Sequence, residues 1–98
     1  MRLYCGIVFS YTNTAVDYTV ITGDYGILVD TTTAPVIITL PATPMDGETH
    51  FIKDEMGTSP LNPITVQGNS KTIDGSGSFV INQPYESYTL LYSVLTNN

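Results

Sequence analysis

Few residues in this 98-residue chain have the chemistry of a reactive site. His50 is its one histidine and Cys5 its one cysteine, so a Cys-His nucleophile pair would require these two distant positions to meet. The pattern favours His50 as a half-exposed strand residue on the same face as Glu48, two positions earlier. A second hypothesis is that three copies of His50 surround the threefold axis of a trimer and bind a metal ion.

The acidic residues form no recognisable site. Asp46 and Asp74 each precede a glycine, which is typical of a turn, and neither belongs to the Asp-x-Asp-x-Asp-Gly loop that binds calcium. No two carboxylates are singled out as a glycosidase pair. The stretch 75–77 lacks the third glycine and the following helix of a phosphate-binding loop. We therefore expect no catalytic residue, no cofactor and no bound metal, and a protein that is not an enzyme.

Tyrosine is the one abundant residue type that can recognise a ligand. The chain has seven tyrosines and no tryptophan. Tyr88 and Tyr92, with Leu90 between them, fall on one face of a predicted strand and are candidates for stacking on a sugar. Aromatic packing in the core or at a subunit contact is the favoured interpretation of the same stripe.

Composition indicates an all-β domain without a charged ligand surface. Val, Ile, Thr, Tyr and Phe, which favour strands, number 42, whereas Ala, Leu, Glu, Lys, Arg, Gln and Met number 21. The net charge is −6, so the chain lacks the cations that bind nucleic acid or anionic lipid. Charged residues make up only 12%, about half the usual share, which suggests that neighbouring molecules cover part of the surface.

Turn signals divide the chain into short strands. The stretch 12–14 is predicted to be a loop, and 17–22 with 27–30 a hairpin closed by Gly23–Gly26. Pro35 and Pro41 bound the next strand, because proline cannot donate a ladder hydrogen bond. The fold predicted is a small antiparallel β-sandwich or β-prism-like domain. Its other strands are expected at residues 3–10, 36–40, 48–54, 64–67, 71–74, 79–82 and 87–94.

The N-terminal strand is the predicted assembly element. Leu3, Cys5, Ile7 and Phe9 form one of its faces, and the opposite face is also apolar. A domain this small usually needs a staple, and one cysteine allows no disulfide within the chain. We therefore expect identical chains to associate, with 1–16 used for assembly and 17–93 forming the main part of a single domain that spans 1–98. The short apolar run after Met1 and Arg2 is not expected to be a signal peptide, so synthesis in the cytoplasm is expected.

Two stretches resemble a β-rich module of tailed-bacteriophage virion proteins. They read "YTVITGDYGILVDTTTAPVIITLPATPMDGETHFIKDEMG", from Tyr18 to Gly57, and "ITVQGNSKTIDGSGSFVINQPYESYTLLYS", from Ile64 to Ser93. The matching pieces are "ILVDTT", "PVIITLP", the "DG" turn, "IKD", "ITV", "KTIDG" and a last strand rich in Tyr and Leu. The chain departs from the module in its N-terminal apolar strand and in lacking a final tryptophan.

The resemblance implies a structural role on the outer surface of a virion, with trimeric assembly. A free-standing product of this size fits a capsid-decorating or cement protein, whose partners are its own copies and the major capsid protein. One alternative is a tail-fibre or receptor-binding module that contacts host glycans through Tyr88 and Tyr92. Another is a carbohydrate-active enzyme. Nucleic acid and membrane are not expected as partners.

Overall fold

The protein is all-β. The computed structural model describes residues 10–98, in which there is no helix and hence no helix able to cross a membrane. The expected contact residues Leu3, Cys5, Ile7 and Phe9 lie outside the described residues. The eight strands are β1 (Tyr11–Thr14), β2 (Tyr18–Thr19), β3 (Gly26–Val29), β4 (Val36–Thr39), β5 (Thr49–Asp54), β6 (Ile64–Gln67), β7 (Ser78–Ile81) and β8 (Ser87–Leu91).

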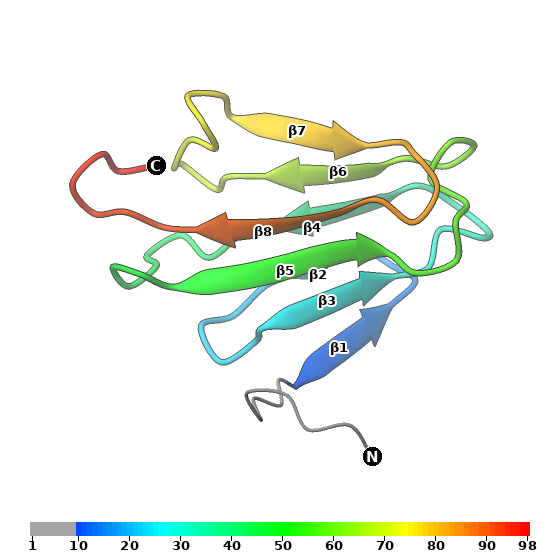
Figure 1. Cartoon of the computed structure of the whole chain (residues 1–98), viewed down its shortest axis with the longest axis horizontal. Helices are drawn as coiled ribbons and strands as arrows, with labels where there is room; N and C mark the ends of the chain where they lie inside the picture. Colours follow the sequence, from blue (N-terminus) through cyan, green and yellow to red (C-terminus); the bar gives the residue numbers. More distant parts are fainter. Residues whose placement is uncertain (1–9) are drawn as a thin grey trace, which may run out of the picture.

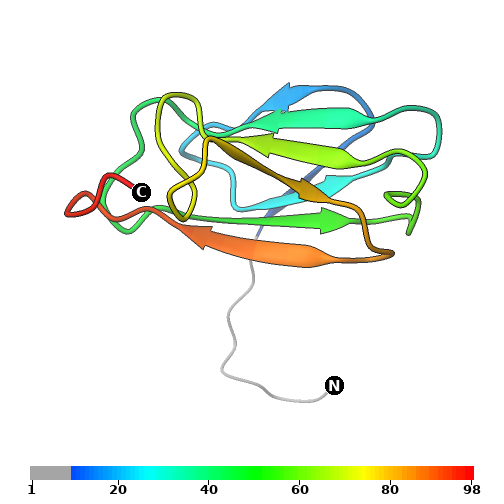
Figure 2. The ribbon, with the colours of Figure 1, turned by 90° about the horizontal axis from the view of Figure 1, so that it is seen from above.

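The strands form two four-stranded sheets that face each other (Figures 1 and 2). One sheet has the order β1-β3-β5-β8 and the other β2-β4-β6-β7. From β1 to β6 the chain crosses from one sheet to the other after every strand. It therefore winds three rungs of a flattened coil, β1–β2, β3–β4 and β5–β6, before β7 and β8 reverse direction at the edges.

The expectation of antiparallel pairing is wrong for most of the described strands. The pairs β1–β3, β3–β5, β2–β4 and β4–β6 are parallel, and β5–β8 and β6–β7 are antiparallel. The predicted hairpin around Gly23–Gly26 is also wrong, because β2 and β3 belong to different sheets. The segment instead connects β2 of one sheet to β3 of the other, and Asp24 stabilises it. Asp24 Oδ2 accepts hydrogen bonds from Tyr18 Oη at 2.6 Å and Ile21 N at 3.0 Å.

Most strand positions agree with the sequence prediction. Strand β6 matches it residue for residue, and β4 starts after Pro35 as expected. Two segments differ. Residues 12–14, predicted to be a loop, lie within β1. Residues 71–74, predicted to be a strand, form a loop in which Ile73 makes only an isolated bridge to Ser76, because the turn at Asn69 and Ser70, both with positive φ, breaks the extended path.

The core consists of β-branched side chains aligned in rows across the strands. In one sheet Val36, Ile64 and Ile81 occupy the same register, and all three are buried. In the facing sheet Ile27 pairs with Ile52, and both are fully buried. β-branched residues suit such rows because their few rotamers pack well on a pleated surface. The complete core is Val20, Ile27, Val29, Val36, Ile38, Ile52, Ile64, Val66 and Ile81.

A buried carboxylate joins two loops at one end of the coil. Asp54, the last residue of β5, is fully buried. Its Oδ1 accepts a hydrogen bond from Gly57 N at 3.0 Å, and its Oδ2 accepts from Ser59 N at 3.0 Å and Tyr85 N at 3.3 Å. Burial acts to raise the Asp54 pKa, but these hydrogen bonds, together with one from the Ser59 hydroxyl, outweigh it and hold the pKa below its ordinary value of 3.8.

Tyr85 depends on this cluster because its backbone is in the left-handed region, with φ of 61°. The Asp54 carboxylate accepts its N–H, and Lys53 Nζ donates to its carbonyl at 2.8 Å. Its ring lies over Gly57, where an added Cβ would approach ring carbons to 2.6 Å. Gly57 also has φ of 74°. The positive φ therefore favours glycine at position 57, and a side chain there would also displace the exposed Tyr85 ring.

Replacing the buried carboxylate should weaken the fold strongly. Asp54→Asn turns one acceptor oxygen into a donor that faces buried N–H groups, and we expect it to lower the free energy of unfolding by about 3 kcal/mol at neutral pH. Urea denaturation followed by circular dichroism measures the change. The exposed Asp74→Asn is the matched control and should shift the stability by less than about 0.5 kcal/mol.

The same carboxylate sets a pH dependence. Because the folded-state pKa of Asp54 is lowered, the unfolded chain binds a proton at this group before the folded chain does. The stabilisation that Asp54 contributes is therefore complete at pH values above the pKa of Asp54 in the unfolded chain. It is lost as the pH falls from that pKa to the lower pKa of Asp54 in the folded chain. Below the folded pKa, wild type and Asp54→Asn should differ less than at pH 7; a constant difference would contradict this assignment.

Candidate functional site: a cavity between the sheet ends

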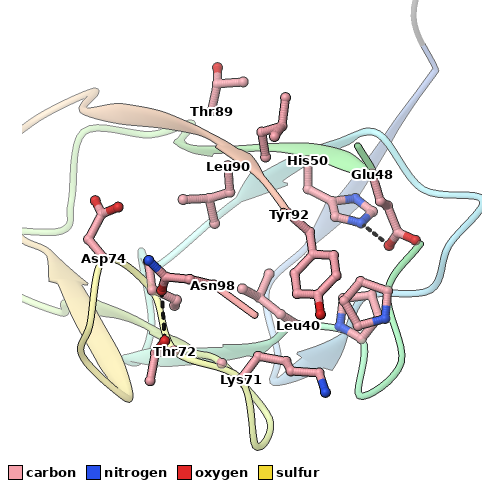
Figure 3. A pocket seen from close by; sticks show the side chains of 15 residues that line it. Leu40, Glu48, His50, Lys71, Thr72, Asp74, Thr89, Leu90, Tyr92 and Asn98 are labelled. Atoms are coloured by element: carbon pink, nitrogen blue, oxygen red, sulfur yellow. Dashed lines mark hydrogen bonds and ion pairs between the residues drawn. The ribbon is translucent and has the colours of Figure 1, made fainter. Parts of the chain in front are cut away.

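A cavity of about 140 Å³ opens between the sheets at the end where β4 and β6 finish and β5 begins (Figure 3). Leu40 and Leu90 contribute apolar walls from opposite sheets. Polar groups come from Glu48 and His50 on one side and from the 68–74 loop and the C-terminal residue Asn98 on the other. The cavity therefore combines apolar walls with polar groups from three separate segments, which is the usual make-up of a small-ligand site.

Glu48 and His50 form the most buried polar pair at this cavity. The alternation of β5 turns His50, Ile52 and Asp54 inward, and His50 pairs with Leu90 of β8. His50 Nε2 lies 2.6 Å from Glu48 Oε2, and Glu48 Oε1 accepts a hydrogen bond from Met45 N at 3.0 Å. The Glu48 side chain is only 6% exposed. The expectation that Glu48 and His50 share a face is confirmed.

The expectation that His50 is half-exposed is wrong: the residue is 4% exposed. The physical reason is that the facing sheet covers the inner side of β5, which is flanked by β3 and β8 in its own sheet, so every second residue of β5 is buried. A side chain held inside one chain and bonded to Glu48 is poorly placed to reach a symmetry axis. The structure therefore weighs against an axial metal site built from three copies of His50.

The Glu48 carboxyl is held in its charged form. Burial acts to raise its pKa, but hydrogen bonds from Met45 N–H and His50 and the interaction with Thr22 outweigh burial and lower the pKa below 4.5. The Glu48 carboxylate accepts the hydrogen bond from His50 Nε2. The other ring nitrogen, Nδ1, is buried and has no hydrogen-bond partner among the described residues. Nε2 is therefore committed to Glu48, and Nδ1 is enclosed by the protein.

The C-terminal residues and the 68–74 loop form the other wall. Asn98 Oδ1 accepts hydrogen bonds from Thr72 Oγ1 at 2.7 Å and Gly75 N at 3.2 Å. The loop turns sharply at Gly68, where an added Cβ would come within 1.9 Å of the Lys71 carbonyl oxygen. Only glycine fits there. The tight turn brings Lys71 to the cavity, where it lies across from Tyr92 (Figure 3).

The two candidate stacking tyrosines have different surroundings. The Tyr88 ring packs edge-on against Phe79 of the facing sheet, with ring centroids 5.0 Å apart and an interplanar angle of 72°. Its hydroxyl donates to Glu86 Oε2 at 2.7 Å. Tyr92 lies beyond the end of β8 and lines the cavity, and its hydroxyl donates to Asn97 Oδ1 at 2.8 Å. Tyr88 thus contacts the facing sheet while 40% of its surface stays exposed, and Tyr92 is the one that lines this cavity.

Sequence reasoning missed the other polar groups at the cavity. Lys71, Asp74 and Asn98 are brought together by the 68–74 loop and the chain end, and no spacing in the sequence indicates this. The Glu48-x-His50 spacing was the one available signal, since alternate residues of a strand share a face. No group of His, Cys, Asp or Glu suited to a metal ion occurs in residues 10–98.

Removing the charge of Glu48 should destabilise this end of the coil. In Glu48→Gln the side-chain amide can still accept from Met45 N–H, but the charge-assisted bond to His50 is lost, and we expect a loss of about 1–2 kcal/mol at pH 7. The loss should shrink as the pH falls below 4.5, because the unfolded wild-type chain takes up a proton at Glu48 there, whereas the folded chain does so only at lower pH. Urea denaturation at several pH values measures this. Glu86→Gln is the control, and equal losses in both variants would refute a special role for the buried pair.

No protein-family model matches the chain, and no curated protein shows significant similarity to it.

Proposed function

We propose that this protein is a structural component of a bacteriophage virion, carried on the outer surface of the particle, where it decorates or cements the capsid as a homotrimer. The observation that carries the proposal is that the sequence stretches that resemble the phage module coincide with the strands of the fold. The two resembling stretches, 18–57 and 64–93, supply every described strand except β1. The resembling pieces therefore constitute one continuous coil and are not scattered over unrelated parts of the chain.

The surface supports a role in assembly. Several large apolar side chains are exposed although the chain is small, among them Leu61, Leu91 and Leu95. Charged residues that would keep such a surface apart from neighbours are scarce. Contacts with neighbouring subunits would remove these side chains from water and contribute about 25 cal/mol for each Å² of apolar surface buried. The acidic charge suits a position away from the packaged genome.

The number of copies on the particle tests the proposal. A capsid-decorating protein occupies symmetry-related positions on the head, so we expect hundreds of copies per virion, measured by quantitative mass spectrometry of purified particles against the major capsid protein. Labelled antibody should mark the head in electron micrographs. A few copies confined to the tail would instead indicate a tail appendage, and absence from the particle would refute the virion assignment.

A receptor-binding module is the second candidate, favoured by the cavity beside Tyr92. An aromatic ring next to the carboxylate and amide groups of Glu48, Asp74 and Asn98 is a suitable surface for one sugar ring. Glycan-array binding should then be lost in Tyr92→Ala and kept in Tyr85→Ala, whose tyrosine does not line this cavity. Equal glycan binding by both variants would exclude the cavity as the site.

A further inference from the structure

The first rung of the coil leaves a strand edge that nothing in the described chain covers. β1 pairs with β3 on one side only, and it is the outermost strand of its sheet. Ser10 and Thr14 direct their carbonyls to Gly26 N and Asp30 N. Backbone groups of alternate residues in a strand point to opposite sides, so Tyr11 and Asn13 direct their N–H and C=O groups outward, away from β3.

Apolar side chains surround this open end. Tyr11 is 65% exposed, Val16 in the connection from β1 to β2 is 70% exposed, and Ile21 just after β2 is 61% exposed. A flat edge with free backbone groups and neighbouring apolar side chains is a template for another strand. A segment that covers this edge must have alternating apolar residues and backbone N–H and C=O groups that are not already paired.

The N-terminal segment of this protein has that composition. Leu3, Cys5, Ile7 and Phe9 alternate with other residues that carry no charge. The segment is preceded by Arg2, which is positive. Residues 10–98 carry two lysines and nine carboxylates, a formal charge of −7, and Asp17 and Asp24 lie in the connections that flank β2. The charges of the segment and of the coil are therefore complementary.

The segment cannot readily cover the edge of its own chain. Ser10 already accepts the hydrogen bond from Gly26 N at 3.2 Å, so the pairing of β1 begins there. A fold-back onto β1 would have to turn at Val8 and Phe9. Tight hairpin turns require positive φ and are made by Asn, Asp or Gly, whereas β-branched and aromatic residues are poor there. The sequence of the segment therefore favours pairing with a different copy.

We infer that the outer edge of β1 binds residues Leu3–Phe9 of a second copy of this chain, which adds a strand to the sheet. The added strand satisfies the outward backbone groups of Tyr11 and Asn13 and covers apolar surface beside Val16 and Ile21. The inference specifies the contact partner of the N-terminal segment and in that respect rests on the proposed assembly function. It holds for the purified chain, so it can be tested without virus particles.

Proline at Asn13 provides the sharpest test. Asn13→Pro removes the outward N–H of β1 and leaves the hydrogen bonds to β3 intact, a position where edge strands accept proline. Asn13→Ala is the matched control, because it removes the same bonds between Asn13 Nδ2 and Glu55 but keeps the N–H. Sedimentation equilibrium of the full chain should show self-association of wild type and Asn13→Ala, and about 100-fold weaker association of Asn13→Pro.

A second variant acts on the other partner of the contact. Ile7→Asp lies outside the coil and should weaken association by a similar factor without lowering the thermal stability measured by circular dichroism. If Asn13→Pro fails to fold, the association of Ile7→Asp tests the proposed contact instead. Wild type that stays monomeric at about 100 μM, or association that survives in Ile7→Asp, would overturn the inference. Self-association through this edge in a protein that is absent from virions would refute the proposed function and leave the contact standing.

Discussion

Alignment of β-branched side chains in rows is the constraint on which the rest of the structure depends. Each rung must present Ile or Val to the interior at the register set by the rung before it, as Val36, Ile64 and Ile81 do in one sheet and Ile27 and Ile52 in the other. The space between the sheets is filled only if every crossing has the right length. The connections are therefore as constrained as the strands: a fully buried aspartate, Asp54, ends β5 and holds the loops that follow, and Gly68, which has no room for a Cβ, begins the loop after β6.

Strand β5 shows how the core and the cavity are built from one alternation. Its inward residues are His50, Ile52 and Asp54. The central one is apolar and packs in the row, whereas the outer two are polar and reach the two ends of the coil. At one end Asp54 collects three backbone N–H groups, and at the other His50 binds Glu48 at the cavity. Both carboxylates have lowered pKa values, so the two ends lose stability together as the pH falls.

The sequence was sufficient to predict the fold class and most strand positions, because β-branched composition and proline boundaries act locally. It could not predict the pairing direction. Strands such as β3 and β4 have the same inward alternation in a parallel and an antiparallel sheet, so the period of two carries no information about the neighbour. The burial of His50 was missed for a related reason, since it depends on the facing sheet and on the position of β5 between β3 and β8. The cavity residues Lys71 and Asn98 meet through loop geometry that no local pattern encodes.

The winding of the coil also bears on how the chain first folds. Among the eight described strands, β6 and β7 are the only neighbours in space that are also consecutive in sequence. Every other pairing closes a loop that contains at least one strand of the facing sheet or, for β5–β8, two, and such closures cost entropy before they gain contacts. The β6–β7 pair lies in the last third of the chain. During synthesis on a ribosome, the β6–β7 pair therefore emerges after most of the other strands. We expect the earlier rungs to stay unpaired until then.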